Sequence, residues 1–83
     1  MSESKRVVIK DSNGLHAKKC LDLVNHAQKY TSVLRLIHNG HEIDIKSILG
    51  LMSLCVPQGD EVIIQASGKD QKEALETLSC KLM

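Results

Sequence analysis

Aromatic side chains are nearly absent from this 83-residue sequence. It contains no Phe and no Trp, and Tyr30 is its single aromatic residue. Proteins that bind single-stranded nucleic acids stack the bases on aromatic rings, and this sequence lacks the residues for such a surface. The formal net charge is only +1, which argues against a basic surface for nucleic acids or anionic membranes. The core must be built from aliphatic side chains, Ala, Met and Cys.

Cysteines and long apolar runs are also scarce. Cys20, Cys55 and Cys80 are widely spaced, form no CxxC pair and are odd in number, so we expect neither a disulfide framework nor a zinc site. We predict buried free thiols in a reducing cytoplasm. The polar residues 1–6 are followed by only three apolar residues, so we expect neither a signal peptide nor a membrane span. No metal or other cofactor is expected.

The spacing of apolar and turn residues predicts four strands and three helices. Asn39-Gly40 is the strongest short-range hairpin signal and joins the second strand to the third. Ser47 is suited to capping a short helix, which we prefer to a strand at that place. Asp70 and Glu73 have the spacing of a capping box for the last helix. The expected strands are 7–9, 33–37, 41–46 and 61–66, and the expected helices are 16–29, 48–54 and a final one marked by Leu75, Leu78 and Leu82.

The element order βαββαβα predicts an α+β fold. We expect an open-faced sandwich, in which a four-stranded antiparallel sheet carries three helices on one face, as a single domain over residues 1–83. The side of the first helix that should face the sheet carries Ala17, Cys20, Leu21, Val24 and Ala27. In the third strand, Ile43 and Ile45 should point inward.

The second face of such a sheet lies toward water. Its expected apolar residues are Val8, Val33, Ile37 and Ile63. These residues are interpreted either as scattered exposed aliphatic side chains, which are normal, or as a self-association surface. A monomer and a weak homodimer therefore both remain open.

His16 lies where a glycine-containing loop enters the first helix. Free N–H groups and the positive end of the helix dipole favour an anion there, and imidazole is a competent nucleophile near neutral pH. Lys18 and Lys19 add positive charge in the same turn. From spacing alone, a helix cap or a surface residue is the commoner explanation of such a histidine. The other histidines, His26, His38 and His41, are interpreted as solvated.

Two segments, residues 14–17 and residues 46–54, resemble the HPr family. Gly14-Leu15-His16-Ala17 is similar to the start of the family's active-site motif, Gly-Leu/Ile-His-Ala/Thr-Arg-Pro-Ala. Residues 46–54, Lys-Ser-Ile-Leu-Gly-Leu-Met-Ser-Leu, resemble its regulatory segment, Lys-Ser-Ile-Met-Gly-Val/Leu-Met-Ser-Leu, with one conservative change. The second match is the more specific one. The resemblance covers essentially the whole chain.

The resemblance implies a cytoplasmic phosphocarrier, an intermediate in phosphoryl transfer rather than a turnover enzyme. His16 would take the phosphoryl group from Enzyme I of the phosphoenolpyruvate sugar phosphotransferase system, with Lys18 assisting, and pass it to enzyme IIA acceptors. Ser47 would be the serine that the HPr kinase/phosphorylase modifies. The implied phosphate-stabilising residues are Asn13, Ala17, Lys18 and Lys19. The implied partner-docking residues are Ile48, Leu49, Leu51 and Met52.

The sequence departs from the family where the motif continues Arg-Pro-Ala. Lys18 offers a mobile point charge in place of the planar fork of Arg. Lys19 replaces a proline that would preset the first helical turn, and it adds a cation at the unfavourable end of the dipole. Cys20 replaces Ala on the apolar side of the helix, where a core role is favoured over a catalytic thiol.

An altered histidine motif beside an intact serine segment leaves a second function open. The family includes Crh, a relative that lacks the active-site histidine and acts as a regulator through its serine. This chain would then act through Ser47 and the catabolite control protein, with little or no carrier activity. Ser47 also has a purely structural explanation, because an N-cap serine needs no kinase.

Overall fold

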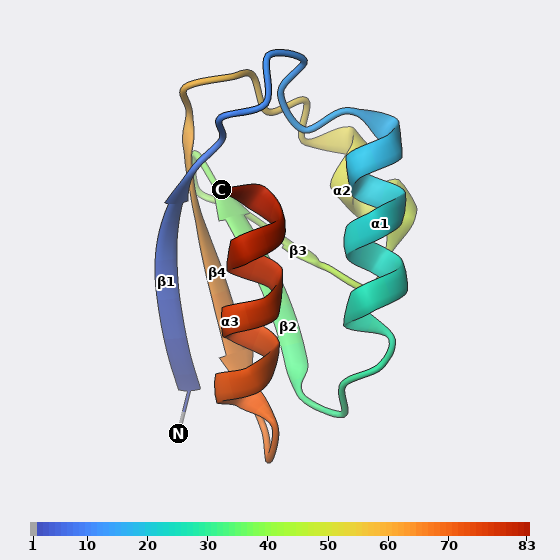
Figure 1. Ribbon diagram of the computed structural model, residues 1–83, viewed down its shortest axis with the longest axis vertical. Helices are drawn as coiled ribbons and strands as arrows, with labels where there is room; N and C mark the ends of the chain where they lie inside the picture. Colours follow the sequence, from blue (N-terminus) through green and yellow to red (C-terminus); the bar gives the residue numbers. More distant parts are fainter. Residues whose placement is uncertain (1) are drawn as a thin grey trace.

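The computed structural model describes residues 2–83 and confirms the α+β open-faced sandwich. Its four strands form one antiparallel sheet in the order β1-β4-β2-β3 (Figure 1). No helix within residues 2–83 is long and apolar enough to cross a membrane. The strands are β1 (Ser2–Val8), β2 (Val33–His38), β3 (His41–Asp44) and β4 (Glu61–Ser67), and the helices are α1 (Ala17–Ala27), α2 (Ile48–Ser53) and α3 (Gln71–Leu82).

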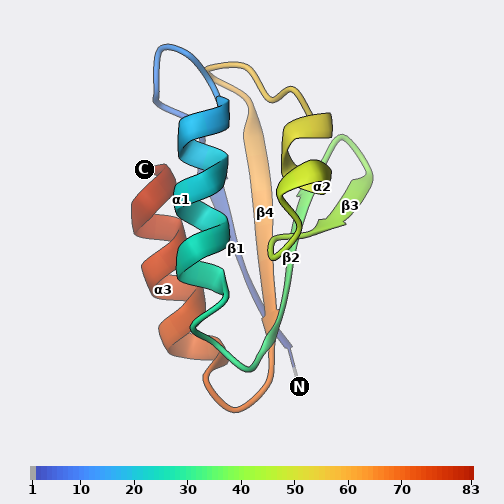
Figure 2. The same ribbon diagram turned by 90° about the vertical axis from the view of Figure 1, so that its right-hand side faces the viewer.

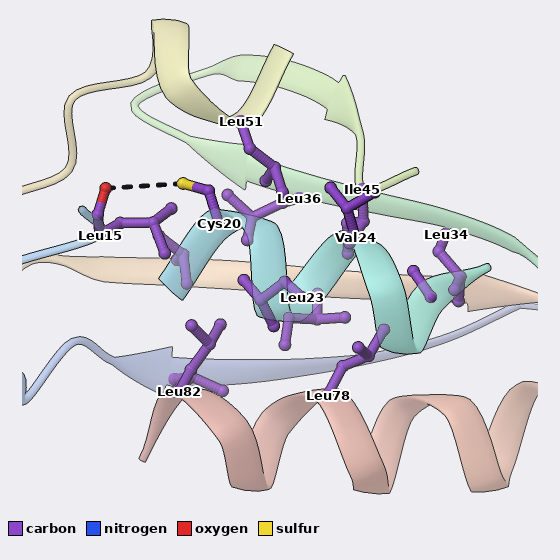
Figure 3. Close-up of a cluster of buried hydrophobic side chains, with 14 of the residues drawn as sticks. Leu15, Cys20, Leu23, Val24, Leu34, Leu36, Ile45, Leu51, Leu78 and Leu82 are labelled. Carbon is purple, nitrogen blue, oxygen red and sulfur yellow. Dashed lines mark hydrogen bonds between the residues drawn. The ribbon is translucent and has the colours of Figure 1, made fainter. Parts of the chain in front are cut away.

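The core lies between one face of the sheet and the helices. Helices α1 and α3 run side by side along that face, and α2 packs against α1 and β3 (Figure 2). Successive side chains of a strand point to opposite faces, so β2 and β4 each bury every second residue. Figure 3 shows leucines of the sheet and of all three helices meeting in this layer. The buried residues of these two strands are Leu34, Leu36, His38, Val62, Ile64 and Ala66.

The open face of the sheet carries the predicted aliphatic residues. Val8 and Val33 are exposed, while Ile37 and Ile63 are half-buried and lie opposite each other on β2 and β4. Because these residues alternate with polar ones, the apolar surface of this face is interrupted. Two ion pairs link neighbouring strands on this face, Arg6–Glu61 at 3.9 Å and Arg35–Glu42 at 2.9 Å.

The hairpin between β2 and β3 forms at the predicted place. Asn39 and Gly40 both have positive φ, 50° and 81°, as a type I′ turn requires. Strand β3 ends at Asp44, two residues earlier than predicted. Ile45 nevertheless lies in the core, and Ile43 is half-buried.

Helix α1 is shorter than predicted, and its buried side is rotated. Residues 16–29 were expected to be helical, whereas the helix spans Ala17–Ala27. Ala17 and Leu21, expected to face the sheet, are exposed, and Leu23 is buried instead. The two leucines are equally apolar, so helical spacing alone did not distinguish them. The buried residues, Cys20, Leu23, Val24 and Ala27, keep the spacing of one helix face.

The predicted capping box at the start of α3 is absent. Asp70 makes no capping bond to the helix. Its carboxylate instead accepts the N–H groups of Thr31 and Ser32, at 2.9 and 3.0 Å, and the hydroxyl of Ser32. The Ser32 hydroxyl, followed by the Thr31 N–H, lowers the pKa of Asp70 to about 2. Asp70 therefore ties the loop between α1 and β2 to the start of α3.

The prediction of buried thiols is right for one cysteine and wrong for two. Cys20 is buried in the core, whereas Cys55 and Cys80 are exposed. Cys55 follows α2 and has φ +50°. Cys80 lies on α3 but is not among the residues that this helix buries.

The prediction that His38 is solvated is also wrong. His38 is only 7% exposed, because it follows Leu34 and Leu36 on the inward side of β2. Its Nε2 lies 2.8 Å from the Asp60 carboxylate, which accounts for a polar ring at the edge of an apolar core.

Candidate functional site

Two loops meet at one end of the sheet and hold the start of α1. One joins β1 to α1, and the other joins α2 to β4 (Figure 1). The N–H of Leu15 donates to the carbonyl of Val56 at 2.8 Å, and the N–H of Gly59 donates to the carbonyl of Ile9 at 2.8 Å. These bonds fix the path by which the chain enters the helix.

The close contact between the loops requires glycine at position 14. Gly14 has φ +68°, and a Cβ at this position would overlap the carbonyl oxygen of Val56 and press on Pro57. Only glycine adopts this conformation without steric cost. The N–H of Gly14 also donates to the carbonyl of Asp11 at 2.9 Å. The turn from Asp11 to Gly14 is thus stabilised by its own hydrogen bond, and His16 follows two residues after it.

His16 is the N-cap residue of α1, but its ring makes no capping bond to the helix. Its Nε2 lies 3.2 Å from Oδ2 of Asp11. The other carboxylate oxygen of Asp11 accepts the N–H of Asn13 at 2.9 Å. Both side chains of the pair are 30% exposed. Sequence reasoning missed Asp11, and the only available signal was an acidic residue in the turn that precedes His16.

The carboxylate of Asp11 determines which nitrogen of His16 carries a proton. The N–H of Asn13, followed by the ring of His16, holds the pKa of Asp11 below 3.8. At neutral pH this carboxylate is ionised and can only accept hydrogen bonds. Nε2 therefore carries the proton, and in the neutral ring Nδ1 keeps its lone pair. Within residues 2–83, no hydrogen bond engages Nδ1.

The first turn of α1, which directly follows His16, supplies N–H donors that the helix does not use. The first bond of the helix runs from the N–H of Cys20 to the carbonyl of His16, at 2.9 Å. The N–H groups of Ala17, Lys18 and Lys19 therefore have no acceptor within the helix. No acidic side chain lies in this turn. Such a helix end favours an anionic group.

The two lysines of the turn differ in what they contact. Lys19 donates from Nζ to the carbonyl of Lys81 at 3.0 Å and so joins the start of α1 to the end of α3, which lie together in Figure 2. Lys18 is exposed and makes no hydrogen bond or ion pair with any residue of the part described. Lys18 is thus the uncommitted cation near His16. One surface hollow is lined by Asp11, His16, Lys18, Lys19 and Asp22.

Asn13 and Cys20 take different places around His16. Asn13 is exposed in the loop, beside the Asp11 carboxylate. Cys20 is fully buried, and its Sγ donates to the carbonyl of Leu15 at 3.6 Å (Figure 3). Burial raises the pKa of the Cys20 thiol, which disfavours the reactive thiolate. Cys20 is therefore a core residue.

Ser47 lies at the second candidate position. It is exposed and caps α2, and its Oγ accepts the N–H of Gly50 at 3.2 Å. The structure confirms Ser47 as the N-cap residue of a short helix.

Helix α2 exposes only part of the predicted docking set. Leu49 is 79% exposed and Met52 is 46% exposed, while Ile48 is half-buried. Leu51 is 0% exposed, because it points from α2 into the core (Figure 3). Including Leu51 among the docking residues was therefore wrong, since a fully buried side chain cannot contact a partner.

Comparisons with known proteins agree with these features. A family model described as the PTS HPr component phosphorylation site matches residues 3–82. The phosphocarrier protein HPr of Mycoplasma pneumoniae (strain ATCC 29342 / M129 / Subtype 1) is 41% identical over 78 residues, which are 93% of this chain and 89% of that protein.

Solved structures with the same fold include an HPr phosphocarrier protein and Crh. The phosphocarrier protein HPr from Bacillus anthracis str. Ames has a TM-score of 0.95 and 32% identity, covering 99% of this chain and 98% of that chain. Crh, the catabolite repression protein of Bacillus subtilis, was solved as a domain-swapped dimer. It has a TM-score of 0.78 and 38% identity, covering 94% of this chain and 90% of that chain.

Proposed function

Because this chain belongs to the HPr family of phosphocarrier proteins, we propose that His16 accepts a phosphoryl group from Enzyme I and passes it to enzyme IIA acceptors in the cytoplasm. The observation that supports this most is the state of His16. Its ring lies at a helix N-terminus, where Asp11 engages Nε2 and no residue of the described range 2–83 bonds to Nδ1. The protein acts as a stoichiometric intermediate, because its phosphorylated form must be discharged before it can accept again.

The phosphoryl group on His16 is stabilised by the first turn of α1. The N–H groups of Ala17, Lys18 and Lys19 donate to its oxygens, as anion sites at helix ends do. The ammonium group of Lys18 adds a mobile positive charge, and Asn13 contributes from the loop. Because Lys19 already donates to the carbonyl of Lys81, its side chain contributes less than that of Lys18.

Partners dock on the exposed apolar side chains of α2. Leu49 and Met52 project from this helix, and Ile48 contributes its exposed part. Enzyme I and the enzyme IIA acceptors use this surface in turn, so each must dissociate before the next one binds. The exposed methionine fits such shared contacts because its unbranched, flexible side chain adapts to different partner surfaces.

Phosphorylation of Ser47 by the HPr kinase/phosphorylase regulates this docking. A phosphate adds a charge of about −1.5 to −2 at pH 7, next to the surface formed by Leu49 and Met52. The added charge weakens apolar contacts with Enzyme I and creates a contact for the catabolite control protein. A regulator that acts through Ser47, with little or no carrier activity, is the second candidate. It is favoured by the replacement of Arg-Pro by Lys18-Lys19 and by the likeness to Crh.

A reconstituted relay separates the two candidates. Phosphoenolpyruvate, magnesium, Enzyme I and a purified enzyme IIA are combined, and phosphate on the acceptor is measured with and without this chain. We expect the acceptor to be labelled only when the chain is present, with labelling lost in His16→Ala and retained in Ser47→Ala. An unlabelled acceptor, in a relay that an ordinary HPr completes, would favour the regulator.

The departure from Arg at position 18 gives a second test. In Lys18→Arg, the planar guanidinium group can bind the phosphoryl oxygens through two hydrogen bonds. We expect this variant to accept phosphate faster than the parent, measured by quenched flow. An unchanged rate would mean that Lys18 does not contact the phosphoryl group.

A further inference from the structure

We infer that Asp11 is the residue that positions His16. Its carboxylate holds the imidazole with the proton on Nε2, so that the lone pair of Nδ1 is available to attack phosphorus. This inference rests on the proposed carrier function and names a residue for the same site. It is carried by the 3.2 Å contact between Oδ2 of Asp11 and Nε2 of His16.

The Asp11 carboxylate is itself held in place. The carboxylate oxygen Oδ1 accepts the N–H of Asn13 at 2.9 Å, and the backbone carbonyl of Asp11 accepts the N–H of Gly14 at 2.9 Å. The carboxylate therefore belongs to a closed turn whose shape depends on the left-handed Gly14. Because this acceptor is fixed, the hydrogen-bonded ring of His16 rotates less freely. The smaller loss of rotational entropy on reaching the reactive geometry favours transfer.

The charge of Asp11 also suits the transfer step. The lone pair of Nδ1 forms the new N–P bond while the bond from phosphorus to the donor breaks, and its electron pair stays with the donor. The ring keeps its proton on Nε2 and becomes an imidazolium. The ionised Asp11 stabilises this positive charge, as carboxylates beside catalytic histidines do. When an acceptor attacks the phosphoryl group, the N–P bond breaks and its electron pair returns to Nδ1.

The other charged groups of the hollow do not duplicate Asp11. Lys18 and Lys19 are cations, and Asp22 is the second acidic residue in its lining. Asp22 instead contacts Nδ1 of His26 at 3.4 Å and Nζ of Lys81 at 3.7 Å. Asp22→Asn is therefore a matched control that removes one negative charge from the same hollow without touching the ring of His16.

Asparagine at position 11 gives a test that separates positioning from simple support of the loop. In Asp11→Asn, the side-chain oxygen must still face the N–H of Asn13, because two donors cannot pair. The amide NH2 then faces Nε2 of His16 and can only donate, so the ring must carry its proton on Nδ1. That tautomer has no lone pair at the attacking atom. Asp11→Ala has no such donor and loses only the support.

The order of the two variants is the decisive outcome. We expect Asp11→Ala to reduce the rate of phosphoryl transfer from Enzyme I by roughly ten- to a hundredfold, by analogy with the loss of carboxylates that orient metal-ligating histidines. We expect the more conservative Asp11→Asn to be slower still, and Asp22→Asn to remain within about threefold of the parent. If Asp11 only supports the loop, Asp11→Asn will be the milder variant, and that order would overturn the inference.

The ring nitrogens of His16 provide a measurement that needs no partner. In 15N-labelled protein at neutral pH, two-bond 1H–15N correlation spectra identify the nitrogen that carries the proton. We expect Nε2–H in the parent and Nδ1–H in Asp11→Asn. Retention of Nε2–H in Asp11→Asn would refute the role of Asp11. If the tautomer differs between the two proteins as expected but the parent takes no phosphoryl group, the carrier function alone is overturned.

Discussion

Two leucines separated by one residue in α2 should respond in opposite ways to the same truncation. Leu51 is 0% exposed and packs in the core, so Leu51→Ala leaves a cavity. Such changes cost about 2.7–5 kcal/mol, and we expect about 3 kcal/mol because α2 lies at the margin of the core. Leu49 is 79% exposed, and Leu49→Ala should change stability by less than about 0.5 kcal/mol.

The measurement is urea unfolding together with transfer kinetics. With an m value of about 1 kcal/mol/M, Leu51→Ala should lower the unfolding midpoint by about 3 M. Leu49→Ala should leave the unfolding midpoint unchanged. It should raise the KM of Enzyme I for this protein by about tenfold, which corresponds to about 1.4 kcal/mol of lost binding free energy. Equal loss of stability in both variants would show that α2 does not divide into a buried and a docking side.

Three further perturbations test individual contacts within the fold. Gly14→Ala should destabilise the fold by more than about 1–2 kcal/mol, because φ +68° is unfavourable for Ala and the added Cβ would overlap the Val56 carbonyl. Urea unfolding measures the loss, and an unchanged stability would contradict the loop geometry. Asp70 has its pKa lowered from 3.8 to about 2 in the folded state, so its contribution to stability is present above pH 3.8 and is lost as pH falls toward 2. The melting temperature of the parent should fall over that interval more steeply than that of Asp70→Asn, and parallel curves would count against the contact with Ser32. Lys19→Met removes the donor to the Lys81 carbonyl and should cost about 0.5–1.5 kcal/mol, whereas an unchanged midpoint would show that this bond contributes nothing.

Local patterns predicted most of the fold because the elements are short and strongly marked. Asn39-Gly40 specified the hairpin through the positive φ values of both residues, and Ser47 capped α2 as its place before an apolar run indicated. His38 was misjudged although its signal was present. Alternation with Leu34 and Leu36 places His38 on the inward side of β2, so the two-residue period of the strand and not the polarity of the ring decides its burial.

The contacts between residues far apart in the sequence, and the contact of Asp11 with His16, could not be read from local spacing. Lys19 reaches a carbonyl of Lys81, which only the packing of α1 against α3 brings near. Asp70 has the spacing of a capping residue, but the loop of Thr31 and Ser32 offers its carboxylate more donors. Asp11 meets His16 through the left-handed turn at Gly14, and a backbone conformation of that kind is not encoded in a periodic pattern.

The most direct test of the carrier function is the mass of the intact protein after incubation with Enzyme I, magnesium and phosphoenolpyruvate. We expect one added phosphoryl group that is labile in acid, present in the parent and absent from His16→Ala. An unmodified parent, under conditions in which the same Enzyme I phosphorylates an ordinary HPr, would contradict the account of His16 as the phosphoryl acceptor.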